Sequence, residues 1–206
     1  MKVLTGLEED ALREIGYIGA GHAANALSKM IGGAIDVDLV LASISPVTGL
    51  PKAVGDRETL VTGIYLPITG DVEGVTLVVF PQKSALLLAD LLLKRRPGTA
   101  KSLDTMDESA IKEVGNILSG SCLTALSGLL EMHLLEHVPN MAHGMLGALM
   151  DNVAVQLGRK AEQALILGLD MTARGDIKIQ AFFFLLFTLQ EARVILRAIR
   201  ARAGVE

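Results

Sequence analysis

The sequence predicts a single α/β (α+β) domain, residues 1–206, whose two halves are related by a pseudo-two-fold axis. Three observations predict it: a helical pattern that recurs about 100 residues later, short alternating segments in both halves, and no Pro/Ser-rich linker between them. The two repeats, about 7–97 and 106–203, would each supply only two helices and two or three strands. Neither is expected to close a core alone, so one shared core is predicted.

The recurrence is strongest between residues 10–32 and 109–131. At a fixed offset of 99, eight of 23 positions are identical, whereas average residue usage would give roughly two. Apolar residues recur at helical spacing through both segments, so each is predicted to be a long helix. Asp10 and Ser109 are the expected N-terminal capping residues of these helices.

Strands and shorter helices are predicted after each long helix. Residues 35–39 and 177–181 alternate between apolar and polar side chains, which is typical of strands. Glycine–aspartate pairs introduce a further strand and a helix in both halves, at Gly70–Asp71 with a helix over 84–93 and at Gly175–Asp176 with a helix over 191–199. Residues 141–156 have no similar counterpart in the first half, and we expect one added helix there.

Composition excludes several classes of protein. The formal charge of −4 argues against a dedicated nucleic-acid binder, which needs a basic surplus. The longest apolar run, 181–187, is far shorter than the roughly 20 residues of a membrane-spanning helix. The first ten residues carry no export pattern, and the single Cys122 cannot form an internal disulfide. We therefore expect a soluble cytoplasmic protein.

Two local motifs suggest chemistries that their surroundings disfavour. Gly19–Ala24 matches a dinucleotide-binding fingerprint, but it lies within a predicted helix rather than after a strand, so small residues packed against a neighbouring helix are expected. His133–His137 spells H-x-x-E-H, a zinc motif that requires a helix. The internal repeat places this segment on a strand, where the two imidazoles diverge. A dehydrogenase and a metallopeptidase stay open as distant alternatives.

Two further side chains have simple structural interpretations. Cys122 could be a nucleophile, but no cation lies near it in the sequence, so a small buried helix residue is expected. The arginines near the C-terminus, including Arg200, recur on one side of a predicted helix, where they suit the negative end of the helix dipole.

The repeated glutamate carries the most specific functional signal. On a helix, residues at i, i+4 and i+7 project from one face, and both copies place polar side chains at these positions. The two sets are Asp10, Glu14 and Tyr17 in the first copy, and Ser109, Glu113 and Asn116 in the second. A simply solvated helix face would explain them as well, although an outward Asn is a poor helix former and favours a purpose.

These residues resemble a known family. Glu113-Val-Gly-Asn116-Ile-Leu-Ser-Gly120, preceded by Ser109 and duplicated from Asp10, is similar to the signature of the CheC/CheX/FliY group of chemotaxis phosphatases, and its two-copy length is most like CheC. The resemblance implies a central, mostly antiparallel sheet flanked by the two long helices that carry the motif, with one extra helix in the second half.

The resemblance also implies an activity and a partner. Such proteins hydrolyse the phospho-aspartate of the response regulator CheY. Glu113 and Asn116 would be catalytic, with Glu113 docking on the regulator's lysine and Asn116 orienting the attacking water. Ser109, Asp10 and Glu14 would contribute to docking. Mg²⁺ would belong to the regulator, so no metal or cofactor is expected in this chain.

The first copy departs from the signature. Tyr17 stands where the family has Asn, and a phenol lacks the paired donor and acceptor of an amide, so the first site is expected to be degenerate. The alternative function is a weakly catalytic or non-catalytic adaptor that binds the regulator or CheD. In this family CheD binds the extra helix, which would be residues 141–156 here, with an apolar stripe of Met145, Leu149 and Val153.

Overall fold

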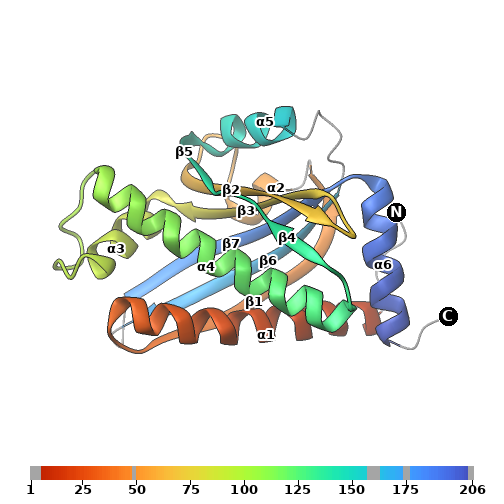
Figure 1. Ribbon diagram of the computed structural model, residues 1–206. Helices are drawn as coiled ribbons and strands as arrows, with labels where there is room; N and C mark the ends of the chain where they lie inside the picture. The colour runs from red at the N-terminus through yellow and green to blue at the C-terminus, as the bar shows by residue number, and fades with distance from the viewer. Residues whose placement is uncertain (1–5, 48–49, 157–162, 174–176, 204–206) are drawn as a thin grey trace.

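A computed structural model describes residues 6–47, 50–156, 163–173 and 177–203 (Figure 1). Gly175 and Asp176, predicted to introduce a strand, lie outside these ranges. The elements in chain order are α1 (Gly6–Ile31), β1 (Ile35–Pro46), α2 (Leu50–Val54), β2 (Leu60–Gly70), β3 (Gly74–Pro81), α3 (Gln82–Leu92), α4 (Thr105–Leu130), β4 (Leu134–Glu136), β5 (Asn140–Met145), α5 (Leu146–Gln156), β6 (Gln163–Ala173), β7 (Ile177–Phe187) and α6 (Leu189–Ala203). The fold is therefore α+β, as predicted.

The strands form a seven-stranded sheet in which every described pairing is antiparallel. The order is β1-β6-β7-β3-β2-β4, and β5 pairs with β2 beside β4. At the centre β3 pairs with β7, with Leu77 opposite Phe184. These strands are apolar on both sides because helices cover both faces of the sheet.

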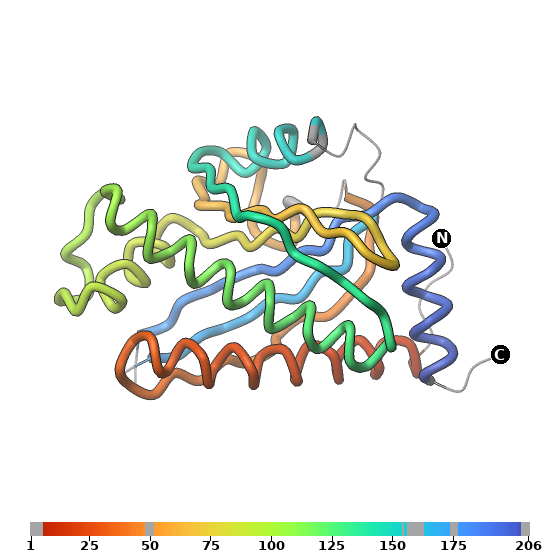
Figure 2. The backbone as a smooth tube through the Cα atoms, viewed as in Figure 1, coloured from red at the N-terminus to blue at the C-terminus, as the bar shows by residue number. Residues whose placement is uncertain are grey.

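The core has a separate layer on each face of the sheet. On one face α1 and α4 lie side by side, as Figure 2 shows, and they pack together with α3 and α6 against side chains such as Leu66 and Phe183. On the other face α5 and α2 cover a smaller cluster that includes Leu77 and Phe184. Both layers are mostly aliphatic, and the largest fully buried side chains are four phenylalanines: Phe80, Phe183, Phe184 and Phe187.

Both long helices are confirmed, but their predicted caps are wrong. Each helix begins four residues earlier, so Asp10 and Ser109 lie inside α1 and α4. The cap of α4 is Asp104, whose carboxylate accepts from the backbone N–H groups of Met106 and Asp107. The Asp107 carboxylate accepts from the Asp104 N–H in return, which completes a capping box.

The segment 141–156 was predicted as one helix, and this prediction is wrong for its first part. Residues up to Met145 form β5, which pairs with β2 at the edge of the sheet, and α5 follows. The predicted partner stripe is also mostly internal. Leu149 and Val153 are buried against the sheet, and Met145 alone of the three is exposed.

One of the two glycines shared by both copies, Gly16 in α1 and Gly115 in α4, allows each long helix to lie close to the sheet. A Cβ on Gly115 would come 2.8 Å from the Ile64 Cβ on β2, and a Cβ on Gly16 would come 2.5 Å from a Leu39 methyl on β1. Both distances are below van der Waals contact. The side of each helix opposite these glycines therefore faces outward, and it carries the two polar sets.

Candidate active site

Ser109, Glu113 and Asn116 lie along the outer side of α4, as the sequence predicts for a helix. Ser109 and Glu113 are exposed and Asn116 is half-buried, whereas Val114 and Gly115 between them are buried against the sheet. Within the described part of the chain, the three polar side chains have no hydrogen bond or ion pair recorded between protein groups. Their donors and acceptors therefore remain available to a second molecule.

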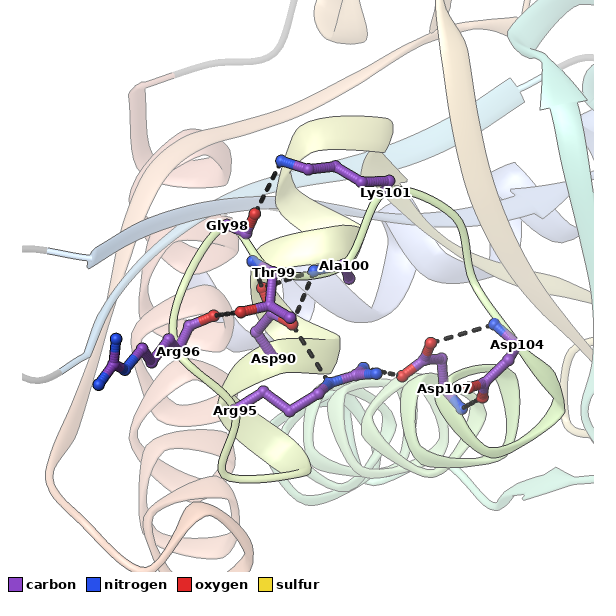
Figure 3. A network of polar contacts seen from close by, with 9 residues as sticks. All are labelled: Asp90, Arg95, Arg96, Gly98, Thr99, Ala100, Lys101, Asp104 and Asp107. Carbon is purple, nitrogen blue, oxygen red and sulfur yellow. Dashed lines mark hydrogen bonds and ion pairs between the residues drawn. The ribbon is translucent and has the colours of Figure 1, made fainter.

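Ion pairs connect the N-terminal end of this helix to the first half of the chain (Figure 3). Arg95, which follows α3, forms an ion pair with Asp107 in the first turn of α4 and another with Asp90, whose oxygen lies 3.2 Å from Nε. Asp90 also accepts from the backbone N–H groups of Thr99 and Ala100. Both acids are buried and both are paired, so the network fixes where α4 begins.

A second set of polar contacts joins the first turn of α4 to the edge of the sheet. His143 on β5 places Nε2 3.2 Å from Oε1 of Glu108, the residue before Ser109. Its Nδ1 lies 2.9 Å from the hydroxyl oxygen of Thr62 on β2, which is buried. Three elements therefore meet through one imidazole beside the candidate face.

Further along the helix, Glu136 on β4 lies against the same outer side. Its Oε2 would be 3.3 Å from a Cβ added to Gly120, one turn beyond Asn116. Burial raises the pKa of Glu136 above that of an ordinary glutamate, and a hydrogen bond from Ser119 opposes part of this effect. Its other oxygen, Oε1, is buried and has no hydrogen-bond partner among the described groups.

The polar set of the first copy lies on the outer side of α1. Asp10 and Glu14 are exposed, and Tyr17 is 58% exposed. The residue of α1 equivalent to Gly120 is Gly21, and a Cβ there would meet no atom within 4 Å. The first face therefore lacks both the amide and the neighbouring glutamate of the second.

The two helices meet between these faces. A Cβ on Gly19 would lie 3.3 Å from the Cys122 sulfur and 3.2 Å from its Cα, so the fingerprint glycine serves helix packing, as expected. Cys122 is buried, and burial raises the pKa of its thiol to about 12. A thiol with that pKa is not an activated nucleophile, which agrees with the structural interpretation.

The H-x-x-E-H segment adopts the strand that the internal repeat predicts for it. His133 and His137 flank β4, a strand rather than a helix. Among the described residues no group of three or more His, Cys, Asp or Glu side chains is suited to a metal ion.

Arg200 differs from expectation, because its Nε lies 2.6 Å from Oε1 of the buried Glu8 on α1. In the described ranges, no helix is long and apolar enough to cross a membrane.

The candidate residues lie on a helix surface rather than in a pocket. A cavity of about 390 Å³ opens beside the N-terminal turns of α4, but Glu108 and His143 line it, not the three residues of the candidate face. Small-molecule sites are usually enclosed. An exposed helix face whose polar groups have no partner among the described residues suits a macromolecular substrate, whose own surface would enclose the reacting group.

Two neighbours of the site, His143 and Glu136, were not anticipated from the sequence. Glu136 lies on β4 and His143 lies on β5. Both strands are held beside α4 by pairing with β2. Glu136 could have been found from its place in the H-x-x-E-H segment. If that segment is a strand, successive side chains point to opposite faces. Leu135 is exposed, so Glu136 points to the other face, toward the protein.

The chain is similar in sequence to proteins of one known family. Residues 106–139, which hold Ser109, Glu113 and Asn116, match the CheC-like family. The chain is 30% identical over 190 residues to the CheY-P phosphatase CheC of Bacillus subtilis (strain 168), covering 88% of this chain and 91% of that protein.

Solved structures share the fold. FliY of Thermotoga maritima superposes with a TM-score of 0.77 at 21% identity, covering 98% of this chain and 100% of that one. A CheX-CheY-BeF3-Mg²⁺ complex from Borrelia burgdorferi matches with a TM-score of 0.50 at 18% identity, over 85% of this chain and 97% of that one. With a relative at 30% identity over nearly the full length of both proteins, the chain belongs to the CheC-like family.

Proposed function

We propose that this protein hydrolyses the phospho-aspartate of a CheY-type response regulator, and that α4 carries the active face. The observation that supports this most is the outward set of Ser109, Glu113 and Asn116 within the segment that matches the CheC-like family. The similar protein of Bacillus subtilis is named a CheY-P phosphatase. The similar CheX structure was solved in complex with CheY.

The proposed reaction is an in-line displacement at phosphorus. Asn116 donates to or accepts from a water molecule and directs its oxygen at the phosphorus atom. The bond from the water oxygen to phosphorus forms while the bond from phosphorus to the aspartyl oxygen breaks. One water proton stays on the attacking oxygen and the other passes to a phosphoryl oxygen, so that the product leaves as inorganic phosphate and the carboxylate is freed. Mg²⁺ is contributed by the regulator, and no group of this chain needs to change its charge.

Glu113 and Ser109 are proposed to dock the regulator. Glu113 is one turn before Asn116 on the same exposed side, so a carboxylate–lysine contact there would bring the amide over the phosphoryl group. Ser109, one further turn toward the N-terminus, extends the docking strip. Among the residues that the structure describes, neither side chain has a hydrogen-bond or ion-pair partner, so docking breaks no contact seen there.

The first face is proposed to be degenerate. Asp10 and Glu14 retain the docking positions, but Tyr17 offers only a hydroxyl at the end of a bulky ring where a small amide is required. A regulator docked there would keep its phosphoryl group or would be excluded by the phenol.

A non-catalytic adaptor is the second candidate function. The exposed ring of Tyr17 favours it, since aromatic residues are enriched in protein interfaces and the ring is 58% exposed on α1. As an adaptor the chain would bind the regulator, or a second protein such as CheD, without accelerating hydrolysis.

One experiment separates the two functions. The decay of a ³²P-labelled CheY-type regulator is followed with the wild-type protein, with Asn116→Ala, and with Asn152→Ala, an exposed Asn of α5 on the other side of the sheet. The phosphatase predicts that Asn116→Ala loses tenfold or more of the acceleration while Asn152→Ala keeps it. Binding to the beryllofluoride-activated regulator should survive in both variants.

The opposite result would support the adaptor. It consists of regulator binding without any acceleration by the wild-type protein, or of acceleration that Asn116→Ala leaves intact.

A further inference from the structure

The contact between His143 and Glu108 lies directly beside the candidate face. Glu108 lies in the first turn of α4 and is adjacent to Ser109. His143 is on β5, which is held at the sheet edge by pairing with β2. The imidazole therefore contacts α4 on one side and the edge of the sheet on the other.

Both ring nitrogens of His143 have a partner. Nε2 lies 3.2 Å from a Glu108 carboxylate oxygen, and Nδ1 lies 2.9 Å from the hydroxyl oxygen of Thr62. Nε2 therefore faces a group that can only accept, and Nδ1 is within hydrogen-bond distance of a hydroxyl that can donate or accept. Thr62 is 2% exposed, so one partner of the ring is buried, whereas the His143 and Glu108 side chains are 37% and 45% exposed.

The described residues of the first copy show no such contact. At the internal offset of 99, Glu9 corresponds to Glu108, but Ile44 on β1 corresponds to His143. An isoleucine side chain cannot bind a carboxylate. The contact is therefore specific to the half whose polar set includes the Asn.

We propose that His143 is a positioning residue for the α4 face: by joining Glu108 to Thr62 it sets the orientation of Ser109 and Glu113 for docking of the phosphorylated response regulator. This inference rests on the proposed function, and it adds a residue outside the helix that carries the signature. His143 itself touches neither the regulator nor the reacting atoms. Its effect is on docking more than on the chemical step, since Asn116 lies two turns beyond Glu108.

The chain supplies a matched control. His137, after β4, places Nε2 3.0 Å from the hydroxyl oxygen of Thr69, which is also on β2. His137→Ala therefore removes the same kind of histidine–threonine contact from the same strand, whereas His143→Ala also removes the contact to α4. His143→Gln is the conservative variant, because its amide oxygen can accept from Thr62 while its NH₂ group faces Glu108.

Three readouts test the proposal. In phospho-regulator decay, His143→Ala should raise the apparent KM roughly three- to tenfold and change the rate at saturation less than twofold, the size expected from losing one ordinary polar contact. Affinity for the beryllofluoride-activated regulator should fall by the same factor. Amide exchange in residues 105–109 should quicken. His143→Gln should recover most of each value, and His137→Ala should match the wild type.

The proposal is overturned if His143→Ala and His137→Ala behave alike, or if His143→Ala leaves KM, affinity and exchange at wild-type values. A wild-type protein that does not accelerate decay would instead overturn the proposed function. In that case the affinity and exchange measurements still decide whether His143 positions α4.

Discussion

Arg200 Nε lies 2.6 Å from Glu8 Oε1, so the last helix of the chain closes onto the first. The second half of the molecule repeats the arrangement with different residues, because Arg95 after α3 pairs with Asp107 at the start of α4. Each buried acid lies in the first turns of a long helix, and each arginine comes from the opposite half. Each half of the chain thus supplies an arginine that binds the long helix of the other half, and each of these helices carries one of the two polar sets.

The two arginines should differ in their contribution to stability. Arg95→Met leaves two buried carboxylates, Asp90 and Asp107, without their cation and should lower the free energy of unfolding by about 3 kcal/mol. Arg200→Met removes one cation from a single buried acid, Glu8, and the Arg200 side chain is more exposed than that of Arg95, so a smaller loss of about 1–2 kcal/mol is expected. Urea unfolding measures both, and equal losses would contradict this ranking.

Gly115 should tolerate no side chain. A Cβ there would lie 2.8 Å from the Ile64 Cβ, which is fixed to the backbone of β2, so Gly115→Ala should destabilise the protein by about 1–3 kcal/mol. Gly128 on the same helix is the control, because an added Cβ meets no atom within 4 Å and alanine is the better helix former. Gly128→Ala should stabilise by up to about 1 kcal/mol. Thermal unfolding of the pair shows whether the sign differs.

Sequence periodicity identified the long helices because their apolar stripes are local. It misplaced both caps because the repeat that revealed the helices begins at Asp10 and Ser109, four residues inside each helix. The true cap of α4, Asp104, lies in the loop before the repeat. Aspartate is a preferred capping residue, but the internal repeat does not extend back to this one.

The edge of the sheet could not be predicted in the same way. Residues 140–145 form a strand only because β2 offers its edge, and a helical pattern in the following residues concealed the change at Leu146. For the same reason His143 and Glu136 were not placed beside α4. The outward position of Glu113 and Asn116 was predictable because helix geometry alone determines it.

Glu136 should make stability depend on pH in a definite direction. Burial raises its pKa in the folded protein, so the folded state binds this proton more tightly than the unfolded chain does. Stability from this group is therefore complete below the pKa of an ordinary glutamate and is lost as pH rises through the raised value. Glu136→Gln should remove that loss and be more stable than wild type at pH 8 by about 1 kcal/mol.

The control for Glu136 is Glu73→Gln, which changes an exposed carboxylate in the turn between β2 and β3. Unfolding in urea at pH 4 and pH 8 should show a gain at the higher pH for Glu136→Gln alone. A gain of the same size at pH 4 would mean that packing of the amide, not loss of the charge, is responsible.

Restoring the amide to the first face tests whether that face still docks a regulator. In an Asn116→Ala background, Tyr17→Asn completes the set of Asp10, Glu14 and an amide on the exposed side of α1. If Asp10 and Glu14 dock, turnover of the phosphorylated regulator should return to a measurable fraction of the wild-type rate. Tyr17→Ala in the same background removes the phenol without supplying an amide and should stay inactive. If Tyr17→Asn stays inactive too, the first face has lost docking as well as chemistry, consistent with its lack of a histidine contact like that of His143 with Glu108.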